Sequence, residues 1–152
     1  MKQGIVYRAY QLALTSESYP FKTAAVVFKG KRILSIGINE VRYNGSIPVR
    51  FKRFLESQHA EAAALAKCKH DELKGCSILI CRVNAGSKKM SSAKPCGRCQ
   101  AMLYDYGIKN VYCTNDNGKI DKYLIKQPQN DIKYHENGQH DYRNLFIIPV
   151  EL

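Results

Sequence analysis

The chain has 152 residues and is strongly basic, with 24 Lys and Arg against 13 Asp and Glu and a formal net charge of +11 at pH 7. This length, without repeats or low-complexity linkers, predicts a single domain over residues 1–152. No signal peptide and no apolar run long enough to cross a bilayer is present, which argues against secreted and membrane classes and predicts a soluble, intracellular, cytoplasmic protein.

The first third of the chain is expected to form a helix and a β-hairpin. Apolar residues at helical spacing predict a helix over residues 4–18. Two strands follow, at residues 24–28 and 33–38, and the turn Lys29-Gly30-Lys31 joins them as a hairpin. A polar loop that contains Gly and Pro then occupies residues 39–56.

The middle of the chain is expected to form a helix, a strand and a loop. Residues 57–69 are Ala-rich with apolar residues at helical spacing, and Ser57 is a candidate N-cap for this helix. The β-branched segment 77–83 predicts a strand. Residues 84–94 are expected to be a loop that leads to the next helix.

The last helix of the predicted core begins near Pro95 and Cys96, and Gly107 is its candidate C-cap. A strand at residues 110–114 follows, then a turn at Asn117-Gly118. A closing strand is expected at residues 145–150. The order α-β-β-α-β-α-β predicts an α/β fold of three layers, in which helices cover both faces of a mixed sheet.

Three side chains that commonly bind metals lie at the starts of two of these helices. His59 lies near the start of the first helix, and Cys96 and Cys99, three residues apart, share one face of the second. Three protein ligands leave one position of a tetrahedral zinc ion open, which is typical of a catalytic site. The sequence therefore predicts one zinc ion per chain, with Glu61 beside it as a carboxylate that is not a ligand.

The motif H-x-E at residues 59–61, followed by P-C-x-x-C at residues 95–99, resembles the signature of the zinc-dependent cytidine deaminase superfamily. This superfamily includes cytidine and deoxycytidylate deaminases, APOBEC-type enzymes and tRNA-adenosine deaminases. The resemblance covers about residues 20–115 and implies a three-layer α-β-α fold with a mixed central sheet. It also implies hydrolytic deamination, in which zinc activates water for attack on C4 of cytosine or C6 of adenine and Glu61 transfers the protons.

Three residues near this motif are candidates for holding the substrate. The resemblance implies that Asn39 contacts the sugar and that the backbone N–H of Ala60 binds the base carbonyl. For Asn39, a turn residue with a local backbone hydrogen bond is the alternative interpretation. Tyr43 lies in the loop before the first motif and is a candidate for stacking on a base.

Basic residues are concentrated in the loops that lead to the two halves of the motif. They are Arg50, Lys52, Arg53, Lys88, Lys89 and Lys94, with Phe51 and Phe54 interleaved in the first group. Alternating basic and aromatic residues suit single-stranded nucleic acid, whose phosphates meet the cations while its bases stack. The expected substrate is therefore cytosine in single-stranded nucleic acid, with DNA favoured. A generally basic surface, or a small site for one nucleotide's phosphate, would also account for the charge.

Two other functions remain open on the sequence. One is deamination of free cytidine, deoxycytidine or deoxycytidylate in nucleotide salvage. The motif Ser92-Ala93-Lys94-Pro95-Cys96 lacks the Trp of APOBEC-type enzymes and the Glu of tRNA-adenosine deaminases, so it does not select a subfamily. The other is a zinc-stabilised nucleic-acid-binding module without catalysis, which leaves Glu61 and the missing fourth ligand unexplained. The remaining cysteines are expected to be free thiols: Cys68, Cys76, Cys81 and Cys113.

Overall fold

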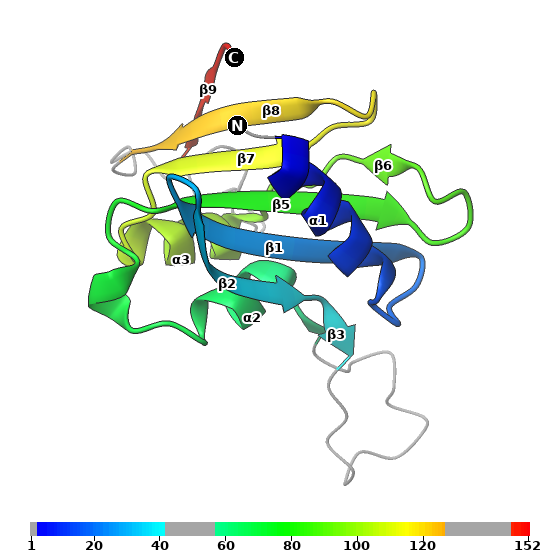
Figure 1. The fold of residues 1–152 in the computed structure, drawn as a ribbon, viewed down its shortest axis with the longest axis horizontal. Coiled ribbons are helices and arrows are strands. Elements are labelled where there is room, and N and C mark those ends of the chain that lie inside the picture. The colour runs from blue at the N-terminus through cyan, green and yellow to red at the C-terminus, as the bar shows by residue number, and fades with distance from the viewer. Residues whose placement is uncertain (1–2, 42–56, 127–146) are drawn as a thin grey trace, which may run out of the picture.

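The computed structural model describes residues 3–41, 57–126 and 147–152. Its helices are α1 (Gln3–Leu14), α2 (Ala60–Leu65) and α3 (Gly97–Asp105), with a 3-10 turn at His70–Glu72. Its strands are β1 (Phe21–Lys29), β2 (Arg32–Ile38), β3 (Glu40–Val41), β4 (Ser57–Gln58), β5 (Ser77–Asn84), β6 (Met90–Ser91), β7 (Asn110–Thr114), β8 (Ile120–Ile125) and β9 (Ile147–Val150). Figure 1 shows how these elements are arranged.

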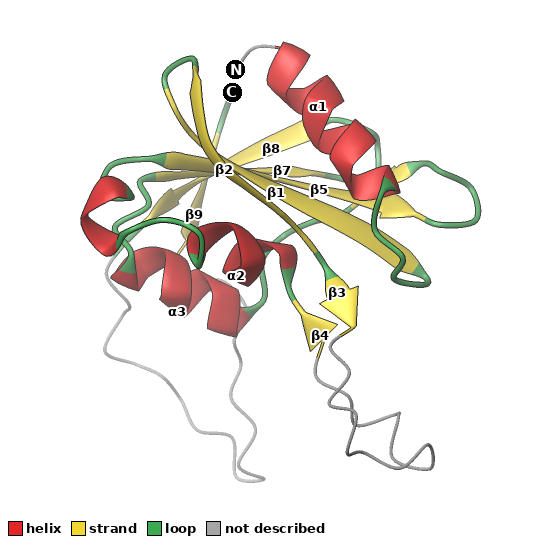
Figure 2. Ribbon diagram, turned by 60° about the horizontal axis from the view of Figure 1, so that its bottom comes forward, coloured by secondary structure: helices red, strands yellow, loops and turns green. Residues whose placement is uncertain are grey.

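The main sheet is mixed and lies between two layers of helices. Within the described residues its strand order is β2-β1-β5-β7-β8-β9, and β6 pairs with the end of β5. Strands β5 and β7 are parallel, whereas the other pairs in the sheet are antiparallel. Helix α1 covers one face of the sheet, and α2 and α3 cover the other (Figure 2). This arrangement confirms the predicted three-layer α-β-α fold.

The central strands are buried on both faces because helices cover each side. Along β1, residues 23–28 are all buried. Successive side chains of a strand point to opposite faces, so Ala24 and Val26 pack with α1 while Ala25 and Val27 pack with α2 and α3. The sheet therefore divides the core into two clusters, and the cluster beneath α2 and α3 supports the predicted metal ligands.

Helix α2 rests directly on the backbone of β2. A Cβ atom placed on Gly37 would lie 2.4 Å from the backbone nitrogen of Ala64 and 2.6 Å from the carbonyl oxygen of Ala60. Beside this contact, the Ser35 hydroxyl donates a hydrogen bond of 2.6 Å to the Ala64 carbonyl. Only glycine permits so close an approach, so Gly37 sets the distance between α2 and the sheet.

The start of α2 differs from the prediction. Ser57 and Gln58 pair with Glu40 and Val41 as the short antiparallel ribbon β3–β4, so Ser57 is not the N-cap. The N-cap is His59, with φ −70° and ψ 151°, and its side chain makes no capping hydrogen bond. Tertiary pairing therefore moved the start of the helix predicted over residues 57–69, and the helix also ends earlier than predicted, at Leu65. In α3, Pro95 likewise precedes the N-cap, which is Cys96.

The second half of the chain contains strands that the sequence pattern did not reveal. The predicted turn at Asn117-Gly118 is present, and β8 follows it and pairs with β7. Alternation along β8 is weak because its residues are only partly buried. The closing strand expected at residues 145–150 is confirmed as β9. None of the helices in the described residues is long and apolar enough to span a membrane.

Candidate active site

The predicted metal ligands come together where two neighbouring helices begin. His59 is the N-cap of α2, Cys96 is the N-cap of α3, and Cys99 lies in the first turn of α3. Helix α2 follows β2 and α3 follows β5, after the β6 hairpin, so the site lies beyond the carboxyl ends of these strands. Such a position is usual for functional sites in α/β sheets.

The distances within this cluster fit a zinc ion. His59 Nδ1 lies 3.3 Å from Cys99 Sγ and 3.7 Å from Cys96 Sγ. Typical Zn–N bonds of about 2.0–2.1 Å and Zn–S bonds of about 2.3 Å place tetrahedral N and S ligands about 3.6 Å apart. Within the described residues, this is the group of His, Cys and acidic side chains that is compact enough for a metal, with all three atoms within 4.8 Å of one another. One His and two Cys are a donor set that suits zinc.

The two thiols share a proton when no metal is bound. A hydrogen bond from Cys99 lowers the pKa of Cys96 to about 5. The pKa of Cys99 is raised, first because its thiol donates to Cys96 and then because it is buried near Glu61. Cys96 is therefore a thiolate at neutral pH, and Cys99 carries the proton. Metal binding requires deprotonated thiols, so zinc would release this proton.

Alkylation of the metal-free protein should therefore be fastest at Cys96. This thiol is exposed, and its reactivity should persist at neutral pH and fall as the pH drops through about 5, because the thiolate is the nucleophile. Cys81 and Cys113 are buried, and burial raises the pKa of each to about 12, so they should react far more slowly. Peptide mass spectrometry after brief iodoacetamide treatment measures this order. Equal labelling with and without added zinc would contradict the assigned metal site.

Glu61 lies beside the ligand cluster without belonging to it. It occupies the first turn of α2 and is only 5% exposed. Burial raises the pKa of its carboxyl group, while a hydrogen bond with the Cys99 side chain acts in the opposite direction. Its carboxylate is not one of the atoms in the compact metal-ligand group. A buried carboxyl group with a raised pKa is suited to hold and release a proton.

A cavity of about 210 Å³ connects these groups. His59, Ala60, Glu61 and Cys96 form part of its wall. The remainder includes Phe21 and Thr23 from β1, Ile80 and Arg82 from β5, and Asn39, Ala93 and Lys94 from the connecting segments. Two of the predicted zinc ligands, His59 and Cys96, and the predicted proton carrier Glu61 therefore face a space that is large enough to admit part of a small molecule.

The predicted substrate residue Asn39 lines this cavity, but much of its side chain is used within the fold. Its Oδ1 accepts hydrogen bonds from the backbone N–H of Thr23 at 2.8 Å and from the Ser16 hydroxyl at 2.7 Å. Its Nδ2 donates to the Phe21 carbonyl at 3.0 Å. These partners are 16 to 23 residues away in sequence, so the bonds are tertiary and not the local turn bond that was the alternative interpretation. The contact of Asn39 with a sugar stays a prediction. Ala60 also lines the cavity, as predicted, and is buried.

Only some of the residues that are predicted to contact nucleic acid lie within the described residues. Lys94 lines the cavity. Lys88 and Lys89 are exposed on the turn between β5 and β6 and are not part of its wall. The other candidates lie outside the described residues: Tyr43, Arg50, Lys52 and Arg53.

The sequence did not single out Phe21, Thr23 or Arg82, although all three line the cavity. Thr23 and Arg82 are direct partners in the pairing of β1 with β5. Neither residue belongs to a recognisable motif in the sequence, and the two come close only through the register of β1 against β5. A basic residue inside the otherwise apolar strand pattern of β5 was the one available signal.

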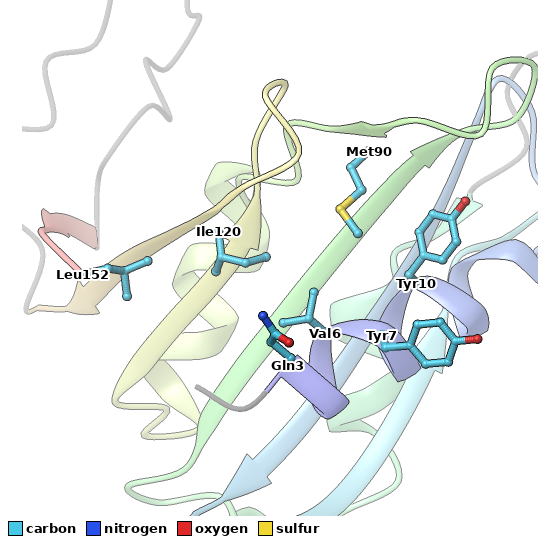
Figure 3. A pocket seen from close by; sticks show the side chains of 7 residues that line it. All are labelled: Gln3, Val6, Tyr7, Tyr10, Met90, Ile120 and Leu152. Carbon is cyan, nitrogen blue, oxygen red and sulfur yellow. The ribbon is translucent and has the colours of Figure 1, made fainter.

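A larger cavity, of about 760 Å³, lies on the other face of the sheet. Figure 3 shows side chains from α1, β6, β8 and the last residue around it, among them Val6, Met90 and Ile120. Its wall is mainly apolar and contains no His, Cys, Asp or Glu among the described residues. It therefore offers neither metal ligands nor a proton carrier of the kind that the smaller cavity contains.

Comparisons with known proteins agree with this geometry. Residues 2–115 match the family model described as the cytidine and deoxycytidylate deaminase zinc-binding region. An uncharacterized deaminase encoded in the luxG 3′ region of Aliivibrio fischeri is 31% identical over 96 residues, which are 60% of this chain and 57% of that protein. The chain thus spans little more than half the length of this relative. The crystal structure of the apo dCMP deaminase from cyanophage S-TIM5 has 24% identity and a TM-score of 0.50, covers 76% of this chain and 86% of its own, and shares the fold.

Proposed function

The chain belongs to the cytidine and deoxycytidylate deaminase zinc-binding family, and from this premise we propose that it is a zinc-dependent hydrolase that converts cytosine to uracil and ammonia. The observation that carries the proposal is the buried Glu61 carboxyl group, which lies in one cavity with His59 and Cys96 and beside Cys99. A purely structural zinc site would require neither the buried acid nor an open coordination position.

The residues of the site have distinct roles in this reaction. His59, Cys96 and Cys99 would hold one zinc ion, which when bound supplies a Lewis acid that lowers the pKa of water to about 7. Glu61 takes a proton from the attacking water and delivers it to N3 of the base. It then carries a second proton to the departing 4-amino group, while the water oxygen stays on C4. The backbone N–H of Ala60, in the first turn of α2, has no carbonyl partner within the helix and can bind the base carbonyl.

The cavity supports an unpaired cytosine as the reacting group. Its volume of about 210 Å³ is below the roughly 300–1,000 Å³ of typical ligand sites, so it suits a base with part of its sugar. A paired base would first have to leave its duplex, at a cost of a few kcal/mol. A free nucleotide and a single strand both present such a base. The net charge of +11 favours a single-stranded nucleic acid as the substrate. The described residues of the cavity wall, in contrast, include only two Lys or Arg side chains, Arg82 and Lys94, which is enough for one phosphate group.

The proposal is tested by measuring ammonia release and zinc content on the same purified sample. We expect about one zinc per chain and turnover of at least one cytosine substrate among cytidine, deoxycytidine, their monophosphates and a single-stranded oligonucleotide. Adenosine tests the related purine reaction. Protein stripped by a chelator should lose turnover and regain it with zinc. Zinc binding without ammonia release from any of these substrates would instead support the non-catalytic binding module.

A further inference from the structure

Arg82 places a positive charge in the wall of the active-site cavity. It follows Ile80 by two residues on β5, so both side chains point to the face of the sheet that carries α2 and α3. Thr23 lies directly across from it on β1 and also lines the cavity. Strand register therefore fixes the place of Arg82, which does not depend on a flexible loop.

The guanidinium group of Arg82 is held by an aromatic ring, and one of its donors, Nε, lacks an acceptor among the described residues. Its Cζ lies 5.2 Å from the centroid of the Phe21 ring, a distance typical of a cation–π contact. Its Nε is buried and has no hydrogen-bond partner within residues 3–41, 57–126 and 147–152. No carboxylate of these residues forms an ion pair with it. A buried donor without an acceptor is costly, which indicates that an acceptor arrives from outside the fold.

The charges around the cavity indicate which acceptor this is. Lys94 is a second cation in the wall, and Glu61 is the acidic side chain among the described lining residues. The cationic side chains of Arg82 and Lys94 in the wall favour an anionic ligand. The planar fork of arginine matches the oxygens of a phosphate group.

We propose that Arg82, with Lys94 beside the same cavity, binds the phosphate of a cytosine nucleotide and makes the enzyme prefer phosphorylated substrates over the free nucleoside. This inference rests on the proposed deaminase function. Phe21 acts as a positioning residue because its ring holds the guanidinium group. The phosphate can belong to a free 5′-monophosphate or to a phosphodiester of a single strand, and both present the same oxygens to arginine.

The test compares deoxycytidine with deoxycytidine 5′-monophosphate in the zinc-loaded enzyme and its Arg82 variants. Arg82→Gln should raise KM for the monophosphate about 10- to 100-fold, the effect of losing a hydrogen bond to a charged group. KM for deoxycytidine should change much less. Arg82→Lys should recover part of the difference, because it keeps the charge but loses the fork. Arg32→Gln removes the same charge from an exposed position on β2 and should leave both KM values unchanged.

A binding measurement separates this inference from the deaminase function itself. Titration calorimetry with deoxyuridine and its 5′-monophosphate needs no turnover. Arg82→Gln should weaken the binding of the monophosphate but not that of deoxyuridine, and thermal melting should show that the variant is folded. If binding shows this selectivity but no substrate is deaminated, the proposed function fails and the phosphate site stands. If cytosine is deaminated but Arg82→Gln impairs nucleoside and nucleotide equally, Arg82 is merely structural and the inference is overturned.

A single-stranded oligonucleotide with one cytosine identifies the source of the phosphate. If Arg82→Gln lowers its turnover more than that of the free monophosphate, Arg82 binds a phosphodiester of the strand. If the monophosphate is affected more, the ligand is a free nucleotide. Both results support phosphate recognition. A wild-type enzyme that converts deoxycytidine as efficiently as both phosphorylated substrates contradicts it.

Discussion

Replacing Glu61 with Gln is expected to reduce deamination by at least about 10²–10⁴-fold, the usual contribution of a general acid–base group. The loss could be larger because one carboxyl group serves several proton transfers. Gln has nearly the same shape, so the buried position should remain filled, but the amide cannot carry the proton. Zinc content should stay near one per chain, because the carboxylate is not among the clustered ligand atoms. Ammonia release and elemental analysis measure the two properties.

A matched control for this variant is Glu72→Gln. Glu72 is exposed in the 3-10 turn that follows α2, so its replacement removes the same charge without touching the cavity. Its activity should equal that of the wild type. Near-normal turnover by Glu61→Gln would refute the role assigned to this residue. Loss of zinc together with activity would make Glu61 a ligand.

Replacing Cys99 with Ala is expected to abolish stable zinc binding and to lower the melting temperature. Cys99 is 3% exposed and contacts His59 at 3.3 Å, so the ion that it holds would join α2 to α3. A ligand present at a thousand times its Kd stabilises a fold by about 4 kcal/mol. For a domain of this size that corresponds to a shift of about 10 °C. Thermal melting with and without added zinc measures the effect.

Cys81→Ala is the matched control for this second variant. Cys81 is also buried, but it packs in the cluster beneath α1, on the other face of the sheet. Its loss leaves a small cavity and should lower the melting temperature with zinc and without zinc by the same amount. A Cys99→Ala variant that kept its zinc-dependent stabilisation would show that the metal is held elsewhere.

The parts of the site that are local in sequence could be predicted, and the parts that depend on tertiary pairing could not. His59, Cys96 and Cys99 are recognisable because ligand type and short spacing are properties of the chain itself. Their position at two helix starts was also expected, and the structure brings them together. The predicted start of α2 was wrong because Ser57 pairs with Val41 of β3, and such pairing between separate segments cannot be recognised from the local sequence.

The place of Arg82 in the site is another feature that could not be predicted from the sequence. In the sequence it is an isolated basic residue in a hydrophobic segment, and nothing nearby suggests an anion. Its relation to Thr23 and Phe21 follows only from the register of β1 against β5. Conversely, the clusters of Lys and Arg were conspicuous in the sequence, yet Lys88 and Lys89 lie away from the cavity. Of the predicted basic residues that the structure describes, Lys94 alone lines the cavity, and Arg50, Lys52 and Arg53 lie outside the described residues, so their contact with nucleic acid stays a prediction.

The contact at Gly37 limits how this active site could be redesigned. Helix α2, which begins at the metal ligand His59, meets β2 backbone to backbone, with no side chain between them at this point. No smaller residue exists with which to lower the helix, and any larger one would lift it together with the ligand. To admit a bulkier base, the side chains to replace are those of the cavity wall that belong to β1 and β5, Phe21 and Arg82. Substrate range is thus adjustable at the wall, whereas the height of the α2 ligand above the sheet is not.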